Sequence, residues 1–162
     1  MENIIKKEGC FVFDRPVSEN EILYLAKEIT AARLIRAGPQ ILSSQLAADF
    51  LSHMIGSYER EVFMILFLDA QNRIIAFEEL FQGTINRSPV YPREIVKRVL
   101  FHNAAAVILA HNHPSGNPNP SDNDKRVTAR VKEALALIET QVLDHLILAG
   151  SNWLSFADHG LL

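Results

Sequence analysis

Cysteine is almost absent from this sequence of 162 residues, since Cys10 is the only one. No disulfide can form within the chain, and a reducing compartment, the cytoplasm, is the simplest setting. Long apolar runs are absent too: none exceeds seven residues, whereas a membrane-spanning helix needs about 20. The N-terminal residues lack the apolar core and the small-residue cleavage site of a secretory signal peptide. We therefore expect a cytoplasmic protein without a membrane segment.

The sequence also lacks an excess of basic residues. Lysine and arginine number 16 against 19 aspartates and glutamates, so the net charge is −3 and the pI is about 6.1. Proteins that bind nucleic acid usually carry a basic stripe, so the net charge does not support such a partner, although local contact with nucleic acid stays open. Hydrophobic residues make up 48% of the chain and charged residues 22%. This is the composition of a globular chain that is long enough to bury a core.

Two helices are expected in the first part of the chain. The first begins with Ser18 and Glu21, which have the spacing of a capping box. The second covers residues 43–56, with Ser44 as the expected N-cap. Helical spacing predicts that the buried face of this second helix consists of Leu46, Phe50, Leu51 and Met54. The two helices would form a helical N-terminal extension over residues 1–57, either packed on the rest of the chain or loosely tethered to it.

From residue 58 the pattern changes to alternating strands and helices. Two runs of β-branched and aromatic residues flank a polar turn at 69–73, which predicts a β-hairpin. The elements expected after it are a helix over 93–103, a buried strand over 104–111, a helix over 121–141, a strand over 142–150 and a short strand within 152–162. The residues expected on the apolar side of the first of these helices are Ile95, Val96, Val99 and Leu100. This alternation predicts an α/β layered domain over 58–162.

A polar stretch, HNHPSGNPNPSDND, follows the buried strand directly. His111 and His113 are two residues apart at the end of this strand, so both imidazoles should face the same side of the sheet. Asp124 falls in the first turn of the next helix. Two imidazole nitrogens and one carboxylate oxygen leave tetrahedral zinc one open position, which is the layout of a catalytic site. Zinc would lower the pKa of a bound water to about 7 and produce a nucleophile at neutral pH.

An ordinary capped turn explains part of the same stretch. Ser121, followed three residues later by Asp124, is a capping box in its aspartate form, and a loop of Pro, Gly and Asn before a helix is routine turn chemistry. Neither the capping box nor the H-x-H spacing indicates a metal by itself, but their combination across a short loop favours one. The two roles are also compatible, because Ser121 can cap the helix while Asp124 faces the ion.

The spacing H-x-H-P-x6-S-x-x-D resembles the JAMM signature of the JAB/MPN metalloprotease superfamily. The longer stretch GTINRSPVYPREIVKRVLFHNAAAVILA before it is similar to the bacterial RadC family, and the resemblance covers about residues 58–162. It implies a JAB/MPN-like curved mixed β-sheet flanked by helices. It also implies that His111, His113 and Asp124 bind zinc. Ser121 would hydrogen-bond the water or help to hold the tetrahedral intermediate.

The family also requires a glutamate at the start of the first strand of the domain. Glu61 fits this position because a hydrophobic strand follows it directly. Glu59 is two residues earlier and would face the same way, and Glu78 and Glu79 on the second strand are further alternatives. For any one of these residues, a solvated carboxylate at a strand end is the ordinary interpretation. We expect Glu61 to be the general base.

Other residues near the motif are expected to have structural roles. Asn112 should point away from the histidine face of its strand. His145 lies in an apolar strand, and a core or edge histidine is expected there rather than a metal ligand. The family's full-length members carry a helix–hairpin–helix region, but residues 1–57 show no clear glycine-centred hairpin motif. The chain therefore resembles a shortened RadC-like protein, and a role in DNA binding is not supported.

Two functions remain in competition. The first is a zinc-dependent hydrolase of a peptide or isopeptide bond, in which Glu61 takes a proton from the activated water and passes it to the leaving amine. The second is a non-catalytic accessory module, stabilised by zinc, that binds a protein or nucleic acid in DNA repair or mobile-element biology. Nothing in the sequence names the peptide or protein substrate. A homo-oligomer also stays open, because the last strand could be an exposed edge.

Overall fold

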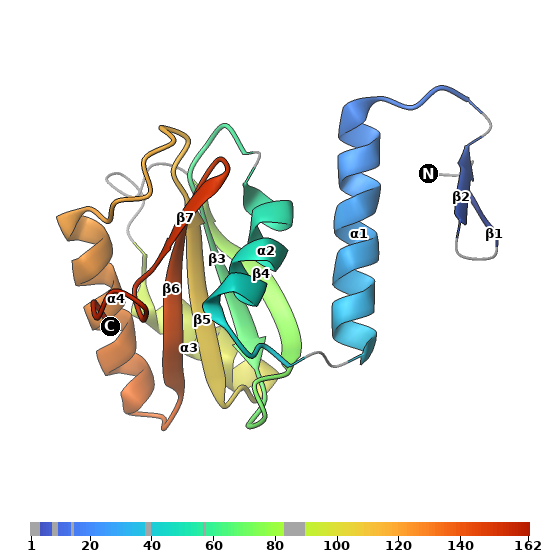
Figure 1. The fold of residues 1–162 in the computed structure, drawn as a ribbon. Coiled ribbons are helices and arrows are strands. Elements are labelled where there is room, and N and C mark those ends of the chain that lie inside the picture. Colours follow the sequence, from blue (N-terminus) through green and yellow to red (C-terminus); the bar gives the residue numbers. More distant parts are fainter. Residues whose placement is uncertain (1–3, 8–9, 14, 38–39, 57, 83–89) are drawn as a thin grey trace.

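The centre of the fold is a five-stranded mixed sheet with the strand order β4-β3-β5-β6-β7 (Figure 1). The computed structural model describes residues 4–7, 10–13, 15–37, 40–56, 58–82 and 90–162. Residues 83–89, the first seven of the stretch that resembles the RadC family, lie outside the described residues. The strands of the sheet are β3 (Val62–Leu68), β4 (Ile74–Gln82), β5 (Ala106–Asn112), β6 (Gln141–Ala149) and β7 (Asn152–Ser155). The pair β5 and β6 is parallel and the other neighbours are antiparallel. The expected α/β fold with a mixed sheet is confirmed.

Helices cover both faces of this sheet, which explains why its central strands are apolar throughout. On one face lies α2 (Ser44–Ile55), packed on alternate residues of β3 such as Met64 and Leu66. On the other face lie α3 (Pro92–His102) and α4 (Asp122–Ala136), packed on the intervening residues of β3, among them Phe63 and Ile65. Since successive side chains of a strand point to opposite faces, β3 and β5 contribute to two separate hydrophobic cores. The helix α4 also connects the parallel strands β5 and β6 (Figure 1).

The N-terminal part is less purely helical than expected. An antiparallel ribbon of β1 (Ile4–Lys7) and β2 (Cys10–Phe13) precedes α1 (Glu19–Ala37). The expected capping box of α1 is present: the Glu21 amide donates to Ser18 Oγ over 3.3 Å, and the Ser18 amide donates to Glu21 Oε2 over 2.9 Å. The ribbon was missed because two four-residue strands are too short to show a clear alternation.

The helix α2 is part of the main core rather than a loosely tethered segment. Its buried residues are Ala47, Ala48, Phe50, Leu51, Met54 and Ile55. Two details of the sequence prediction are wrong. The N-cap is Ser43, whose Oγ accepts from the amide of Leu46, whereas the hydroxyl of Ser44 donates to Asp158, a tertiary partner that the sequence pattern could not reveal. Leu46 is 48% exposed and does not belong to the buried face.

The remaining elements agree with the expected ones in type and order, but α4 ends at Ala136, whereas the expected helix reached residue 141, which lies in β6. The hairpin turn lies between β3 and β4, and β5, α4, β6 and β7 follow in the expected order. In α3, Ile95 and Val99 are buried as expected, but Leu100 is 61% exposed because no element covers its side of the helix in the described part of the chain. No helix among the described residues has the length and apolar character required to span a bilayer. The expected division of the chain at residue 57 stays a prediction.

Replacing Leu51 by alanine is expected to lower the free energy of unfolding by about 2–5 kcal/mol, because a fully buried leucine would leave a cavity between α2 and the sheet. Leu46→Ala, in the same helix, is the matched control and should change stability by about 0.5 kcal/mol or less. Urea unfolding of both variants measures the difference. Equal losses would contradict the orientation of α2 described above.

Candidate metal centre

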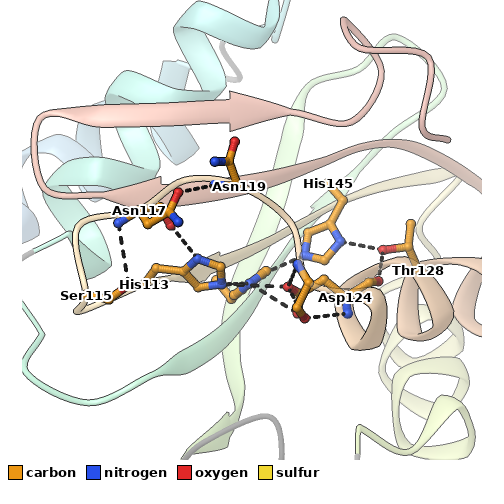
Figure 2. A network of polar contacts seen from close by, with 9 residues as sticks. His113, Ser115, Asn117, Asn119, Asp124, Thr128 and His145 are labelled. Carbon is orange, nitrogen blue, oxygen red and sulfur yellow. Dashed lines mark hydrogen bonds and ion pairs between the residues drawn. The ribbon is translucent and has the colours of Figure 1, made fainter.

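The three residues expected to bind metal lie together at the end of β5 and the start of α4. One donor atom from each of His111, His113 and Asp124 lies within 4.8 Å of the others. Nε2 of His111 is 2.9 Å from Nε2 of His113 and 3.5 Å from Oδ1 of Asp124, and Nε2 of His113 is 3.7 Å from Oδ2 of Asp124. His111 and Asp124 are buried, and His113 is half-buried. This group could hold a metal ion (Figure 2).

The hydrogen bonds of His113 and Asp124 show which of their atoms have free electron pairs for a cation. Nδ1 of His113 lies 2.7 Å from the carbonyl oxygen of Asn117, which can only accept, so Nδ1 carries the proton and a neutral ring has a lone pair on Nε2. Oδ2 of Asp124 accepts from the amide and the hydroxyl of Ser121, over 2.7 and 2.6 Å, which leaves Oδ1 directed at His111. Electron-pair donors thus converge on one point. Such a donor set is satisfied by a metal cation.

The capped-turn interpretation is confirmed alongside the metal group. Ser121 is the N-cap of α4, and its Oγ accepts from the amide of Asp124 over 3.2 Å. The Asp124 carboxylate accepts in return from the Ser121 amide, which completes the capping box. The cap uses one carboxylate oxygen and holds the side chain of Asp124 still. Helix capping therefore orients a metal donor rather than competing with it.

A polar cavity of about 230 Å³ opens beside the metal group. Its lining residues are Glu61, His113, Ser115, Asn117, Asn119, Ser121 and Asp124. Apart from carboxylate and imidazole, the lining consists of hydroxyl and carboxamide groups (Figure 2). A cavity of this kind can bind a small polar part of a substrate by hydrogen bonds, and it does not offer a large apolar pocket.

The four candidate glutamates occupy different surroundings. Glu61 is half-buried and lines the cavity. Glu59 is exposed, and Glu79 lies 3.9 Å from Arg60 in an ion pair. Glu78 accepts hydrogen bonds from Arg98, which lower the pKa of its carboxyl group. Of these residues, only Glu61 belongs to the cavity lining, so it keeps its place as the candidate general base, and this role stays a prediction.

Asn112 holds the segment that carries Glu61. As expected, its side chain points away from the metal group, and it is buried. Its Oδ1 accepts from the amide of Val62 over 2.8 Å, and its Nδ2 donates to the carbonyl oxygens of Tyr58 and Arg60, each over 3.0 Å. The backbone on both sides of Glu61 is thereby attached to Asn112, the residue between the two histidines. No pattern in the sequence indicates this role of Asn112.

His145 has a polar partner that the sequence pattern does not indicate. Its burial in β6 is confirmed, but its Nε2 also lies 2.8 Å from Nδ1 of His111. Burial lowers the pKa of His111 to about 4 and lowers the pKa of His145 well below its ordinary value, so both rings are neutral at pH 7. The available signal was a histidine that precedes the apolar run Leu146–Ala149 in the same strand. Only the pairing of β5 with β6 identifies its partner.

Comparisons with known proteins agree with this geometry. Residues 41–161 match the model of the family described as RadC-like JAB domain. A UPF0758 protein of Vibrio cholerae is 53% identical over 144 residues, which cover 89% of this chain and 90% of the relative. UPF0758 proteins of Thiobacillus denitrificans and Stenotrophomonas maltophilia are 54% and 49% identical, over 82% and 86% of this chain. The matched regions cover 59% and 57% of these two relatives, so they are considerably longer than this chain.

His113→Ala and Asp124→Ala are each expected to abolish stoichiometric metal binding, because each variant removes one of three donors. Metal content of the purified protein, measured by mass spectrometry after reconstitution, should be about one ion per chain in the wild type. Asp122→Ala is the matched control, since Asp122 is an exposed carboxylate in the same helical turn and lies outside the metal group. Unchanged metal content in all three variants would contradict the assignment.

The stability of the metal-free protein is expected to fall as the pH drops from about 6.5 to about 4. In the fold, burial lowers the pKa of His111 to about 4, whereas in the unfolded chain a histidine titrates near its ordinary value of about 6.5. The unfolded state therefore binds more protons within this window, and the free energy of unfolding decreases with falling pH. Urea unfolding at several pH values measures this slope. His111→Asn should reduce the slope, and an unreduced slope would exclude His111 as its source.

Proposed function

The chain belongs to the RadC-like JAB domain family, and we propose that it is a zinc-dependent hydrolase of a peptide or isopeptide bond. The observation that carries this proposal is the open side of the metal group. His111, His113 and Asp124 supply three donors, and the polar cavity lined by Glu61 lies next to them. Three protein donors with room for one more ligand are typical of catalytic rather than structural zinc sites.

Zinc is the metal best suited to this donor set, since two imidazoles and one carboxylate are common zinc ligands. When bound, zinc would activate a water molecule and polarise the carbonyl group of the substrate. The rest of the reaction depends on groups of the chain itself. They must hold the amide in the cavity, accept a proton from the attacking water and return it to the leaving amine.

Glu61 is proposed to carry out the proton transfers. It lines the cavity together with His113 and Asp124, and the hydrogen bonds of Asn112 hold the backbone on both sides of it. A carboxylate in this place can accept a proton from water and, once protonated, can donate it to the leaving nitrogen. Because its backbone is attached to β5, the distance between this carboxylate and the metal ligands should vary little between turnovers.

Ser121 is proposed to help stabilise the negative charge that develops on the carbonyl oxygen. Its hydroxyl lines the cavity, but its proton points at Oδ2 of Asp124, 2.6 Å away. The hydroxyl must therefore rotate from Asp124 to the substrate during the reaction. The N-terminus of α4, where Ser121 lies, contributes a partial positive charge at the same place.

The accessory-module function is favoured by one observation, namely that the capping box already occupies the proton of Ser121 and one oxygen of Asp124. In that case a metal would stabilise the fold, and the protein would act through a protein or nucleic-acid partner. Fluorescence anisotropy with DNA at low and at physiological salt distinguishes the two functions. Salt-dependent affinity would support the module, and no affinity at low salt would exclude its DNA-binding form. The proposed setting is the cytoplasm in either case, as a single cysteine suggests.

Glu61→Gln is expected to reduce turnover by about 10²–10⁴-fold, because the amide side chain cannot transfer a proton, and to leave the metal bound. A library of peptides and isopeptides, with detection of newly released amines, provides the assay. Glu59→Gln is the matched control, since Glu59 is exposed and two residues away, and it should retain activity. A fully active Glu61→Gln variant would overturn the role of Glu61.

A further inference from the structure

A chain of buried hydrogen bonds connects two of the three metal donors through residues outside the metal group. Nδ1 of His111 lies 2.8 Å from Nε2 of His145, and Nδ1 of His145 lies 2.6 Å from Oγ1 of Thr128. Oγ1 of Thr128 in turn lies 2.6 Å from the carbonyl oxygen of Asp124, one helical turn earlier (Figure 2). All four residues are buried. This series of hydrogen bonds thus begins at the side chain of His111 and ends at the backbone of Asp124, both of which belong to the metal group.

The protons in this chain can point in only one direction. A carbonyl oxygen cannot donate, so the single hydroxyl proton of Thr128 lies toward Asp124. Nδ1 of His145 must then donate to Thr128, and Nε2 of His145, which has no proton in a neutral ring, must accept. The remaining donor is Nδ1 of His111. Nε2 of His111 is therefore left with a lone pair, directed at His113 and Asp124.

We propose that His145 and Thr128 are positioning residues of the metal centre, which hold His111 in the tautomer that has its proton on Nδ1 and its lone pair toward the metal. This inference rests on the metal site of the proposed function, but it does not depend on hydrolysis. In the opposite tautomer a proton would occupy the position of the metal. Which nitrogen of a histidine binds a metal is generally decided by the hydrogen bond that the other nitrogen makes.

The surroundings of His145 hold its ring in this orientation. The ring packs on Phe63 and Phe156, with centroid distances of 5.6 and 4.7 Å. Thr128 lies in α4, so these hydrogen bonds also join this helix to β6 and β5 at the level of the metal group. Loss of either polar contact would free the His111 ring to adopt both tautomers. Metal affinity should then fall, while the three donors themselves remain present.

The affinity for zinc, measured by competition with a chromogenic chelator, tests the proposal. His145→Phe removes the acceptor but keeps a planar ring, and it should weaken zinc binding by about 10–100-fold. His145→Gln can accept from His111 through its amide oxygen and donate to Thr128, so it should remain within a few-fold of the wild type. Thr128→Val should weaken zinc binding and Thr128→Ser should preserve it. Wild-type affinity in both His145→Phe and Thr128→Val would overturn the proposal.

A matched control separates this effect from a general loss of stability. Ser155 also has a buried hydroxyl, which donates to Asp144 over 2.6 Å, but this hydroxyl is not part of the series of hydrogen bonds from His111 to Asp124. Ser155→Ala should therefore lower stability without weakening zinc binding. If His145→Phe does not fold, the comparison of Thr128→Val with Thr128→Ser decides the question, since both residues resemble threonine in size.

The tautomer of His111 can also be read directly, without metal or substrate. Long-range ¹H–¹⁵N correlation spectra of the metal-free protein distinguish a proton on Nδ1 from one on Nε2. The wild type should show the proton of His111 on Nδ1, and Thr128→Val should show a mixture. A wild-type proton on Nε2 would overturn the proposal. A protein that binds zinc and has the expected tautomer but hydrolyses no peptide or isopeptide bond would contradict the proposed function alone, so the two failures can be distinguished.

Discussion

The complete burial of His111 is the constraint on which the metal centre depends. An imidazole without access to water needs a partner for each of its nitrogens, and burial keeps the ring neutral. The fold meets this need from two elements. The strand β6 supplies His145 as the partner of Nδ1 of His111, and Nε2 of His111 is directed at His113 and Asp124. A neutral ring with one nitrogen already donating is ready to bind a cation through the other.

The same sheet determines where the candidate general base lies. In the antiparallel pair of β3 and β5, Phe63 is the register partner of His111, so the segment before β3, which carries Glu61, begins beside the end of β5, which leads to His113. Asn112 secures this arrangement with hydrogen bonds to the backbone on both sides of Glu61. Its side chain points to one side of β5 while the histidines point to the other, so alternation along the chain separates the candidate metal donors from the contacts that hold the backbone around Glu61.

The helix α4 has two functions at its first turn. Its capping box satisfies amides that would otherwise lack partners, and the same contacts leave one oxygen of Asp124 for the metal group. Four residues further along, Thr128 binds back to the Asp124 carbonyl and orients His145. One helical turn thus joins the end of β5 to β6. The polar cavity beside it is lined by groups that form hydrogen bonds rather than apolar contacts.

The sequence by itself determined the order of strands and helices from residue 58 onward, together with the group of His111, His113 and Asp124. These follow from local periodicity and from spacing within 14 residues, which need no knowledge of distant contacts. It misjudged Leu46, because an apolar residue at helical spacing is buried only where another element covers it. It misjudged Ser44, because two adjacent serines both suit an N-cap and the contact of Ser44 with Asp158 is tertiary. The partners of His145, Thr128 and Asn112 were decided by the tertiary structure alone. Their contacts join residues up to 54 positions apart, and such contacts depend on strand pairing and register, which leave no local trace in the sequence.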